Sequence, residues 1–124
     1  MDKKYLEELS PEEKYVIANK GTERPFSGEY NEHYKEGTYC CRACGNELYK
    51  SNSKFSSGCG WPSFDEEIEG SVTRYRDTSI GMIRVEICCA NCDGHLGHVF
   101  EGEGFTSKNI RHCVNSLSLK FKAK

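Results

Sequence analysis

The sequence predicts a mainly β fold in a single domain that covers residues 1–124. Three observations predict it. Short segments in which apolar and polar residues alternate, a pattern typical of strands, follow one another after Lys35. One segment near the N-terminus carries helix signals, and two Cys-x-x-Cys pairs interrupt the strand-like segments. A chain of this length has the usual size of one domain, and no linker divides it.

The helix is expected over residues 10–20. Ser10 is a favourable N-cap, Pro11 suits the first helical position, and Glu13 completes a capping box with Ser10. Gly21 is expected to end the helix, because glycine is common just past a helix C-terminus. The segment from there to Lys35 has no clear period and is expected to form an ordered loop.

The first strands are expected at residues 38–40 and 47–49, on either side of Cys41 and Cys44. A hairpin of strand, knuckle and strand is a usual way to present a Cys-x-x-Cys pair to a metal ion. Residues 50–60 are rich in serine and glycine and are expected to form a loop.

Residues 72–76 and 83–87 alternate like the two arms of an antiparallel pair. Ile83, Val85 and Ile87 recur at every second position. One face of this pair is therefore expected to be apolar.

Two further strands are expected, over residues 96–100 and over residues 111–121. The second of these is expected to run without a break. Its period of two places Cys113 and Asn115 on one face, at the start of a row that becomes apolar, and His112 on the other face.

The two Cys-x-x-Cys pairs predict a metal site. Their members are Cys41, Cys44, Cys89 and Cys92. Zn²⁺ prefers a tetrahedron of thiolate or imidazole ligands, and a two-residue spacer lets both sulfurs of a pair reach one ion. We therefore expect one structural zinc ion that staples the domain, with Gly45 and Gly94 supplying the tight turns. The alternative is a cluster of buried or disulfide-bonded cysteines. Cys40 and Cys88 have poorer spacings, and no role is expected for them.

Cys113 is accompanied by residues that can activate a thiol. His95 and His98 lie close together in the sequence, and Arg111 shares the expected strand face of Cys113. A thiol with a pKa near ~8.5 needs such neighbours to attack at neutral pH. Three alternatives remain open: the histidines are zinc ligands, they are ordinary hydrogen-bonded surface residues, or Cys113 is a buried inert thiol.

Trp61 is the only tryptophan, and it follows a lone cysteine, Cys59, in a loop with Pro62. It is either a core residue or a rigid aromatic wall for an apolar group of a substrate.

The composition argues against several classes of function. A net charge of −2 gives no reason to expect a nucleic-acid partner. No apolar run approaches the about 20 residues of a membrane span, so no membrane partner is expected. The segment from Met1 to Tyr5 lacks the apolar stretch of a secretory signal. Paired cysteines without such a signal indicate a cytoplasmic protein, in which they bind metal or take part in catalysis.

Four segments resemble those of the B-type methionine sulfoxide reductases, which reduce the R epimer of methionine sulfoxide. They are residues 21–30 (GTERPFSGEY), 58–64 (GCGWPSF), 95–100 (HLGHVF) and 111–116 (RHCVNS). The resemblance runs over nearly the whole chain, and the two Cys-x-x-Cys pairs fit the zinc-containing branch of the family. It implies a fold of two small antiparallel sheets with helices at the periphery.

The resemblance also implies catalytic roles. Cys113 would attack the sulfoxide sulfur and be left as a sulfenic acid when methionine leaves. His95 and His98 would assist protonation of the sulfoxide oxygen, and Asn115 and Arg111 would support the site.

By the same resemblance, Trp61 would receive the methyl group on the substrate sulfur. Cys59 would condense with the sulfenic acid to a Cys59–Cys113 disulfide, which a dithiol of the thioredoxin type would reduce. The substrate would be methionine-R-sulfoxide, free or in oxidised proteins. The alternative is a non-catalytic zinc-knuckle module that recognises protein or nucleic acid.

Overall fold

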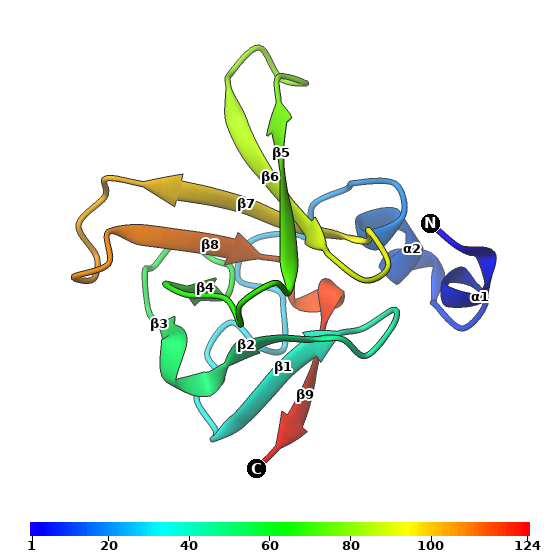
Figure 1. The fold of residues 1–124 in the computed structure, drawn as a ribbon, viewed down its shortest axis with the longest axis horizontal. Helices are drawn as coiled ribbons and strands as arrows, with labels where there is room; N and C mark the ends of the chain where they lie inside the picture. Colours follow the sequence, from blue (N-terminus) through cyan, green and yellow to red (C-terminus); the bar gives the residue numbers. More distant parts are fainter.

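The computed structural model describes residues 1–124 and contains two antiparallel sheets with two short helices at one side (Figure 1). The helices are α1 (Lys3–Leu6) and α2 (Pro11–Ile17). The strands are β1 (Gly37–Cys41), β2 (Glu47–Lys50), β3 (Lys54–Phe55), β4 (Ser63–Phe64), β5 (Val72–Asp77), β6 (Arg84–Cys89), β7 (His95–Glu101), β8 (Ile110–Val114) and β9 (Leu119–Ala123). Two 3-10 turns are η1 (Ser51–Ser53) and η2 (Ser116–Ser118). The mainly β fold with two antiparallel sheets is confirmed.

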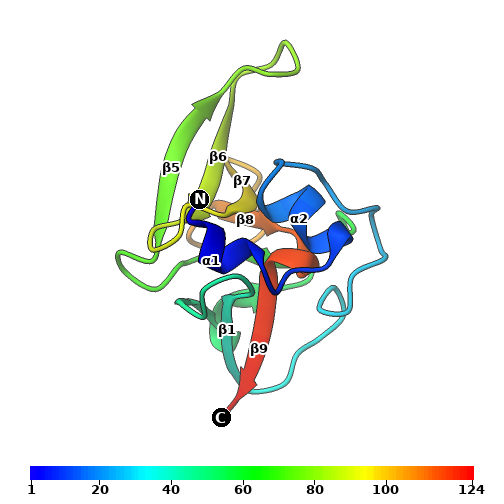
Figure 2. The same ribbon diagram turned by 90° about the vertical axis from the view of Figure 1, so that its right-hand side faces the viewer.

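The smaller sheet has the strand order β2-β1-β9, and the larger one has the order β3-β4-β8-β7-β6-β5. The β5–β6 hairpin extends beyond the rest of the molecule at the top of Figure 1. Helix α2 packs against η2 and β7 at the side of the molecule that faces the viewer in Figure 2. None of the helices has the length and apolar character that a membrane-spanning helix requires.

The core lies between the two sheets. Ile87 and Val114 of the larger sheet belong to one buried cluster with Leu48 and Tyr49 of the smaller sheet. Phe64 stacks on Tyr49 with 4.2 Å between the ring centroids. Because these residues bury one face of the larger sheet, the opposite face of β6, β7 and β8 is left for other contacts.

Helix α2 begins where the sequence predicts. Ser10 Oγ accepts a hydrogen bond from Glu13 N–H, and the Glu13 carboxylate accepts one from Ser10 N–H. The helix ends at Ile17, earlier than the expected Lys20, and Lys20 itself has a left-handed φ of 60°. Gly21 lies against the exposed Tyr15 ring, and a Cβ there would lie 2.3 Å from it.

The expectation of one strand over residues 111–121 is wrong. The chain leaves the larger sheet after β8, turns through η2 and enters the smaller sheet as β9. Asn115 holds the turn in place, because its main-chain N–H and its Nδ2 both donate to Leu96 O, at 2.9 and 3.0 Å. Leu117 therefore does not continue the face of Cys113.

The short strands β3 and β4 lie in segments for which no strand is predicted. Each has two residues, which is too short for a periodic pattern to show. They pair with each other, and β4 also pairs with β8, where Ser63 lies opposite Cys113. This pairing brings the loop that carries Cys59 and Trp61 beside β8.

Candidate active site and metal centre

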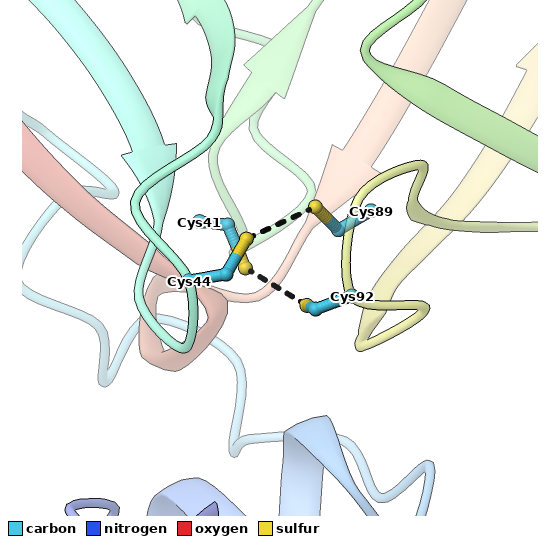
Figure 3. A group of neighbouring side chains, drawn as sticks. All are labelled: Cys41, Cys44, Cys89 and Cys92. Carbon is cyan, nitrogen blue, oxygen red and sulfur yellow. Dashed lines mark hydrogen bonds between the residues drawn. The ribbon is translucent and has the colours of Figure 1, made fainter. Parts of the chain in front are cut away.

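Four cysteine sulfurs meet between the two hairpins that carry the Cys-x-x-Cys pairs (Figure 3). They belong to Cys41, Cys44, Cys89 and Cys92 and lie within 4.8 Å of one another. The two sulfur–sulfur contacts drawn in Figure 3 are each 3.6 Å long. Zn–S bonds of about 2.3 Å in a tetrahedron place the sulfurs about 3.8 Å apart, so the four thiols fit one such ion. Cys40 and Cys88 lie outside this group.

The two knuckles share one backbone geometry. Gly45 N–H donates to Cys41 O and Asp93 N–H donates to Cys89 O, both at 2.8 Å. Gly45 and Asp93 both have positive φ, of 83° and 65°. The sequence led us to expect Gly94 at the tight turn of the second knuckle. The residue with the left-handed φ is instead Asp93. Gly94 is required for space, since a Cβ there would lie 2.8 Å from a side chain of α2.

The exposed face of the larger sheet carries the candidate catalytic residues. Cys113 on β8 lies opposite His98 on β7 and opposite Ser63 on β4. Phe100 on β7 lies opposite Arg111 on β8. Directly opposite residues in an antiparallel pair point to the same side, so these side chains share one face.

A bulge places His95 next to His98. Residues three apart on a regular strand point to opposite faces. The pairing of β6 with β7 shifts between Ile87 and Cys88, which leaves Leu96 as an extra residue on β7. The two imidazoles therefore meet, with 5.7 Å between their ring centroids.

This face is hollowed into a cleft of about 170 Å³. Six of the expected site residues line it: Cys59, Trp61, His98, Arg111, Cys113 and Asn115. His95 does not line the cleft and is buried, with 3% of its surface exposed. The structure thus brings together all the expected residues except His95, which lies beside the cleft in contact with His98.

Cys59 and Cys113 affect each other's ionisation. Hydrogen bonding with Cys113, and further bonds with Ser57 and Ser63, lower the pKa of Cys59 to about 4 although burial opposes this. The interaction with Cys59, together with burial, raises the pKa of Cys113 far above its ordinary value, and Arg111 acts in the opposite direction. The two thiols therefore titrate as a coupled pair, in which the surroundings of Cys59 favour the thiolate more than those of Cys113 do. The sequence led us to expect the lowered pKa at Cys113.

Asp77 fixes the imidazole of His98. His98 Nε2 lies 2.7 Å from Asp77 Oδ2, and Arg84 donates to the same oxygen at 3.1 Å. Hydrogen bonds from Ser79, followed by that from His98, lower the pKa of the Asp77 carboxyl. An ionised Asp77 accepts a hydrogen bond from Nε2 of His98 and so fixes the orientation of the ring.

Glu86 holds His95 in a similar way. His95 Nδ1 lies 2.7 Å from Glu86 Oε2, Lys20 Nζ lies 3.1 Å from Oε1, and the Cys88 thiol donates to Oε2 at 3.3 Å. Burial lowers the pKa of His95, and Glu86 only partly offsets this. The ligand atoms of Glu86, Cys88 and His95 also lie within 4.8 Å of one another, and their hydrogen bonds account for this grouping.

Arg111 provides a fixed positive charge in the cleft. Its Nε and Nη2 donate to the two oxygens of Glu103 at 2.8 and 3.2 Å. Its guanidinium carbon also lies 4.8 Å from the centroid of the Phe100 ring. Only 9% of Arg111 is exposed, so the charge acts on Cys113 with little screening by water.

His112 points away from the cleft, as strand alternation predicts. It is fully buried, and its Nδ1 lies 2.9 Å from the Tyr49 hydroxyl. Burial lowers the pKa of His112 to about 4. This imidazole is therefore neutral at pH 7 and belongs to the core.

The residues that hold the catalytic side chains are not predicted from the sequence. They are Glu23, Asp77, Arg84, Glu86 and Glu103. For two of them a signal exists: Asp77 and Arg84 are opposite each other at one end of the expected β5–β6 pair. The others make contacts between distant segments, which no local pattern records.

The fold and the site together define a small β domain with a four-cysteine metal-type cluster and a separate two-thiol cleft. The SelR domain family matches residues 9–123. The chain therefore belongs to the SelR domain family, which includes B-type peptide methionine sulfoxide reductases similar to it.

Three relatives illustrate the similarity. Peptide methionine sulfoxide reductase B2, chloroplastic, of Arabidopsis thaliana is 57% identical over 91% of this chain, which spans 55% of that relative. Peptide methionine sulfoxide reductase B5 of Oryza sativa subsp. japonica is 54% identical over 97% of this chain and 88% of its own length. Peptide methionine sulfoxide reductase MsrB of Bradyrhizobium diazoefficiens is 51% identical over 99% of this chain and 88% of its own length.

The fold also resembles that of a solved structure, the Mis18 "Yippee-like" domain. The TM-score is 0.54 at 17% identity, over 73% of this chain and 98% of that one. At this identity the similarity concerns the fold alone.

Proposed function

We propose that the protein reduces methionine-R-sulfoxide, free or in oxidised proteins, to methionine. The observation that carries the proposal is that Cys59 and Cys113 line one cleft together with His98 and Arg111. Membership of the SelR family, with relatives named peptide methionine sulfoxide reductases, supports the reaction. The choice of the R epimer rests on the family resemblance.

The reaction needs only two thiols and an external dithiol. The sulfur of Cys113 attacks the sulfoxide sulfur and forms a transient sulfur–sulfur bond while the oxygen is protonated. The hydroxyl then passes to the Cys113 sulfur as the sulfur–oxygen and sulfur–sulfur bonds break, so methionine leaves and Cys113 becomes a sulfenic acid. Cys59 then attacks that sulfenic acid, and the hydroxyl leaves as water when the Cys59–Cys113 disulfide forms. A dithiol of the thioredoxin type reduces this disulfide by exchange. One dithiol is thus oxidised for each sulfoxide that is reduced.

The protons can be assigned to groups in the cleft. Cys113 must lose its proton to solvent or to the incoming substrate oxygen as it attacks, and the nearby Arg111 favours the thiolate that forms. The sulfoxide oxygen must gain a proton, and we assign its delivery to His98, which Asp77 holds in place. His95 lies outside the cleft, so we assign it to the support of His98.

The remaining residues bind and orient the substrate. Trp61 and Phe100 supply the apolar walls of the cleft, which suit the methyl group on the substrate sulfur. Arg111 stabilises negative charge at the reacting thiol. The amide of Asn115 bonds to Leu96 O and to a main-chain N–H, so its part is to keep the edge of the cleft in place.

We further propose that the four clustered cysteines hold one structural zinc ion. A closed four-sulfur site has no open coordination position, so the ion stabilises the fold and takes no part in the reaction. The need for an external dithiol, and the use of cysteine for metal binding, suit a reducing compartment such as the cytoplasm.

An epimer-resolved assay tests the proposal. Methionine-R-sulfoxide and methionine-S-sulfoxide are supplied separately with dithiothreitol, and the released methionine is measured. We expect turnover of the R epimer alone, its complete loss in Cys113→Ser, and unchanged turnover in Cys40→Ser, whose thiol lies outside the cleft. Activity that persists in Cys113→Ser would contradict the assignment. Turnover of neither epimer by the unmodified protein would favour a binding module.

The resolving thiol is tested with thioredoxin and its reductase in place of dithiothreitol. We expect Cys59→Ser to release about one methionine per chain and then stop, because no second thiol in the cleft can form the disulfide. Continued thioredoxin-supported turnover by this variant would assign the resolving role to another cysteine.

A further inference from the structure

Glu23 lies in the loop between α2 and β1 and contacts three parts of the candidate active site. Its main-chain O accepts a hydrogen bond from Trp61 Nε1 at 3.0 Å. Its main-chain N–H donates to Asn115 Oδ1 at 3.0 Å. Its carboxylate Oε1 accepts a hydrogen bond from Leu117 N–H in η2 at 2.8 Å. Only 7% of Glu23 is exposed, so water competes little for these bonds.

The carboxylate is fitted closely into its surroundings. A Cβ on Gly28 would lie 2.5 Å from Glu23 Oε2 and 2.1 Å from Ser116 Oγ, so the absence of a side chain at Gly28 makes room for the carboxylate. Burying a carboxyl group is unfavourable unless it is hydrogen-bonded. Glu23 Oε2 is buried without a hydrogen-bond partner, so the bond that Oε1 accepts from Leu117 N–H is the one that anchors this side chain.

Packing alone does not hold this segment. Thr22 lines the catalytic cleft, and both Thr22 and Glu23 also line a larger hollow of about 730 Å³. The segment thus separates two open spaces. The position of this segment therefore depends more on its hydrogen bonds than would the position of a segment packed on both sides.

We infer that Glu23 is a positioning residue of the cleft: its carboxylate anchors the loop to η2, and the anchored main chain orients the Trp61 indole and the Asn115 amide. The importance of these two side chains for turnover rests on the proposed function. The anchoring itself does not, because it concerns contacts in the folded protein.

Two variants separate the reach of the side chain from its charge. Glu23→Gln keeps an acceptor oxygen at the same distance from the main chain and removes the charge. Glu23→Asp keeps the charge but is one methylene shorter, so it cannot reach Leu117 N–H from the same backbone position. We expect Glu23→Gln to retain the kcat/KM of the unmodified protein for methionine-R-sulfoxide. We expect Glu23→Asp to lose about tenfold or more, because small displacements of positioning groups cost factors of this size.

The fluorescence of Trp61 provides a readout that does not require activity. Trp61 is the only tryptophan, so the emission spectrum and its quenching by acrylamide report on this side chain alone. We expect a shifted emission and easier quenching in Glu23→Asp, and the spectrum of the unmodified protein in Glu23→Gln.

Glu29→Ala is the matched control, because Glu29 is a glutamate of the same loop whose side chain is 63% exposed and bonds Arg42. Its kcat/KM and emission are expected to stay unchanged. Bound zinc and circular dichroism verify that each variant is folded.

The inference is overturned if Glu23→Asp keeps both readouts, or if Glu23→Gln is damaged as strongly as Glu23→Asp. If the unmodified protein reduces neither epimer, the proposed function fails, and the emission comparison still decides whether Glu23 positions Trp61.

Discussion

At the scale of single residues, the two thiols of the cleft have very different surroundings. Cys59 lies in a loop where Ser63 Oγ is 3.5 Å from its sulfur and Ser57 Oγ accepts from its main-chain N–H, and hydrogen bonding there lowers its pKa. Cys113 lies on β8, where burial opposes ionisation and Arg111 is the main group that favours it. Each thiol also sets the charge of the other, so the ionisation of the pair cannot be assigned to one residue alone.

This coupling predicts the effect of removing one thiol. In Cys59→Ser the thiolate that raises the pKa of Cys113 is gone, while Arg111 remains. We expect the pKa of Cys113 to fall by about one unit or more. The rate of alkylation at Cys113 by iodoacetamide, measured against pH by mass spectrometry, should have a lower midpoint in Cys59→Ser than in the unmodified protein. Cys40→Ser serves as the control and should leave the midpoint unchanged. An unchanged midpoint in Cys59→Ser would show that the two thiols titrate independently.

The candidate site was predictable where a residue type itself carries the chemistry. Cys113, His98 and Trp61 were recognised from the sequence and line the cleft. The contact of His95 with His98 was not, because it depends on a bulge at Leu96 that only the pairing of β6 with β7 reveals. Glu86 is one of the alternating polar residues of β6, so the sequence gives no sign that it is buried. Its burial is explained by its hydrogen bond with His95.

At the scale of elements, local signals predicted α2, the β1–β2 hairpin and the β5–β6 hairpin. Their signals, a capping box and alternation on either side of a turn, act within a few residues. The break between β8 and β9 was missed because Asn115 turns the chain through bonds to Leu96 and Glu23, which are distant in sequence. Non-local hydrogen bonds of this kind override a local period of two.

The capping box of α2 gives a prediction at this scale. Ser10→Ala removes the side-chain acceptor of Glu13 N–H at the start of a helix that packs against η2 and β7. We expect the free energy of unfolding to fall by about 1 kcal/mol, measured by urea denaturation of the zinc-bound protein. Ser10→Asp is the control, since aspartate also caps helices well and should keep most of the stability. Equal stability of Ser10→Ala and the unmodified protein would mean that α2 is held by its packing alone.

At the scale of the whole molecule, the four-cysteine cluster joins hairpins that belong to different sheets. Cys41 ends β1 of the smaller sheet, and Cys89 ends β6 of the larger sheet. The two sheets also share the core, and the chain crosses between them at η2. A domain of 124 residues has a modest core, so the proposed metal link between its sheets would add a substantial part of its stability.

Removal of the metal should therefore destabilise the whole fold. The proposed thiol chemistry of the cleft should remain the same reaction, because the metal takes no part in it. Without an ion, neighbouring thiolates repel one another, and the proposed link between the sheets is lost. We expect complete chelation to lower Tm by more than about 10 °C, since each 1 kcal/mol shifts Tm by about 3–6 °C at this size. Thermal unfolding followed by circular dichroism, with zinc content measured on the same samples, checks this.

Cys92→Ser should behave like the chelated protein, and Cys88→Ser, which removes a buried thiol outside the cluster, should retain its zinc. An unchanged Tm after full removal of the metal would mean that the shared core alone holds the two sheets together.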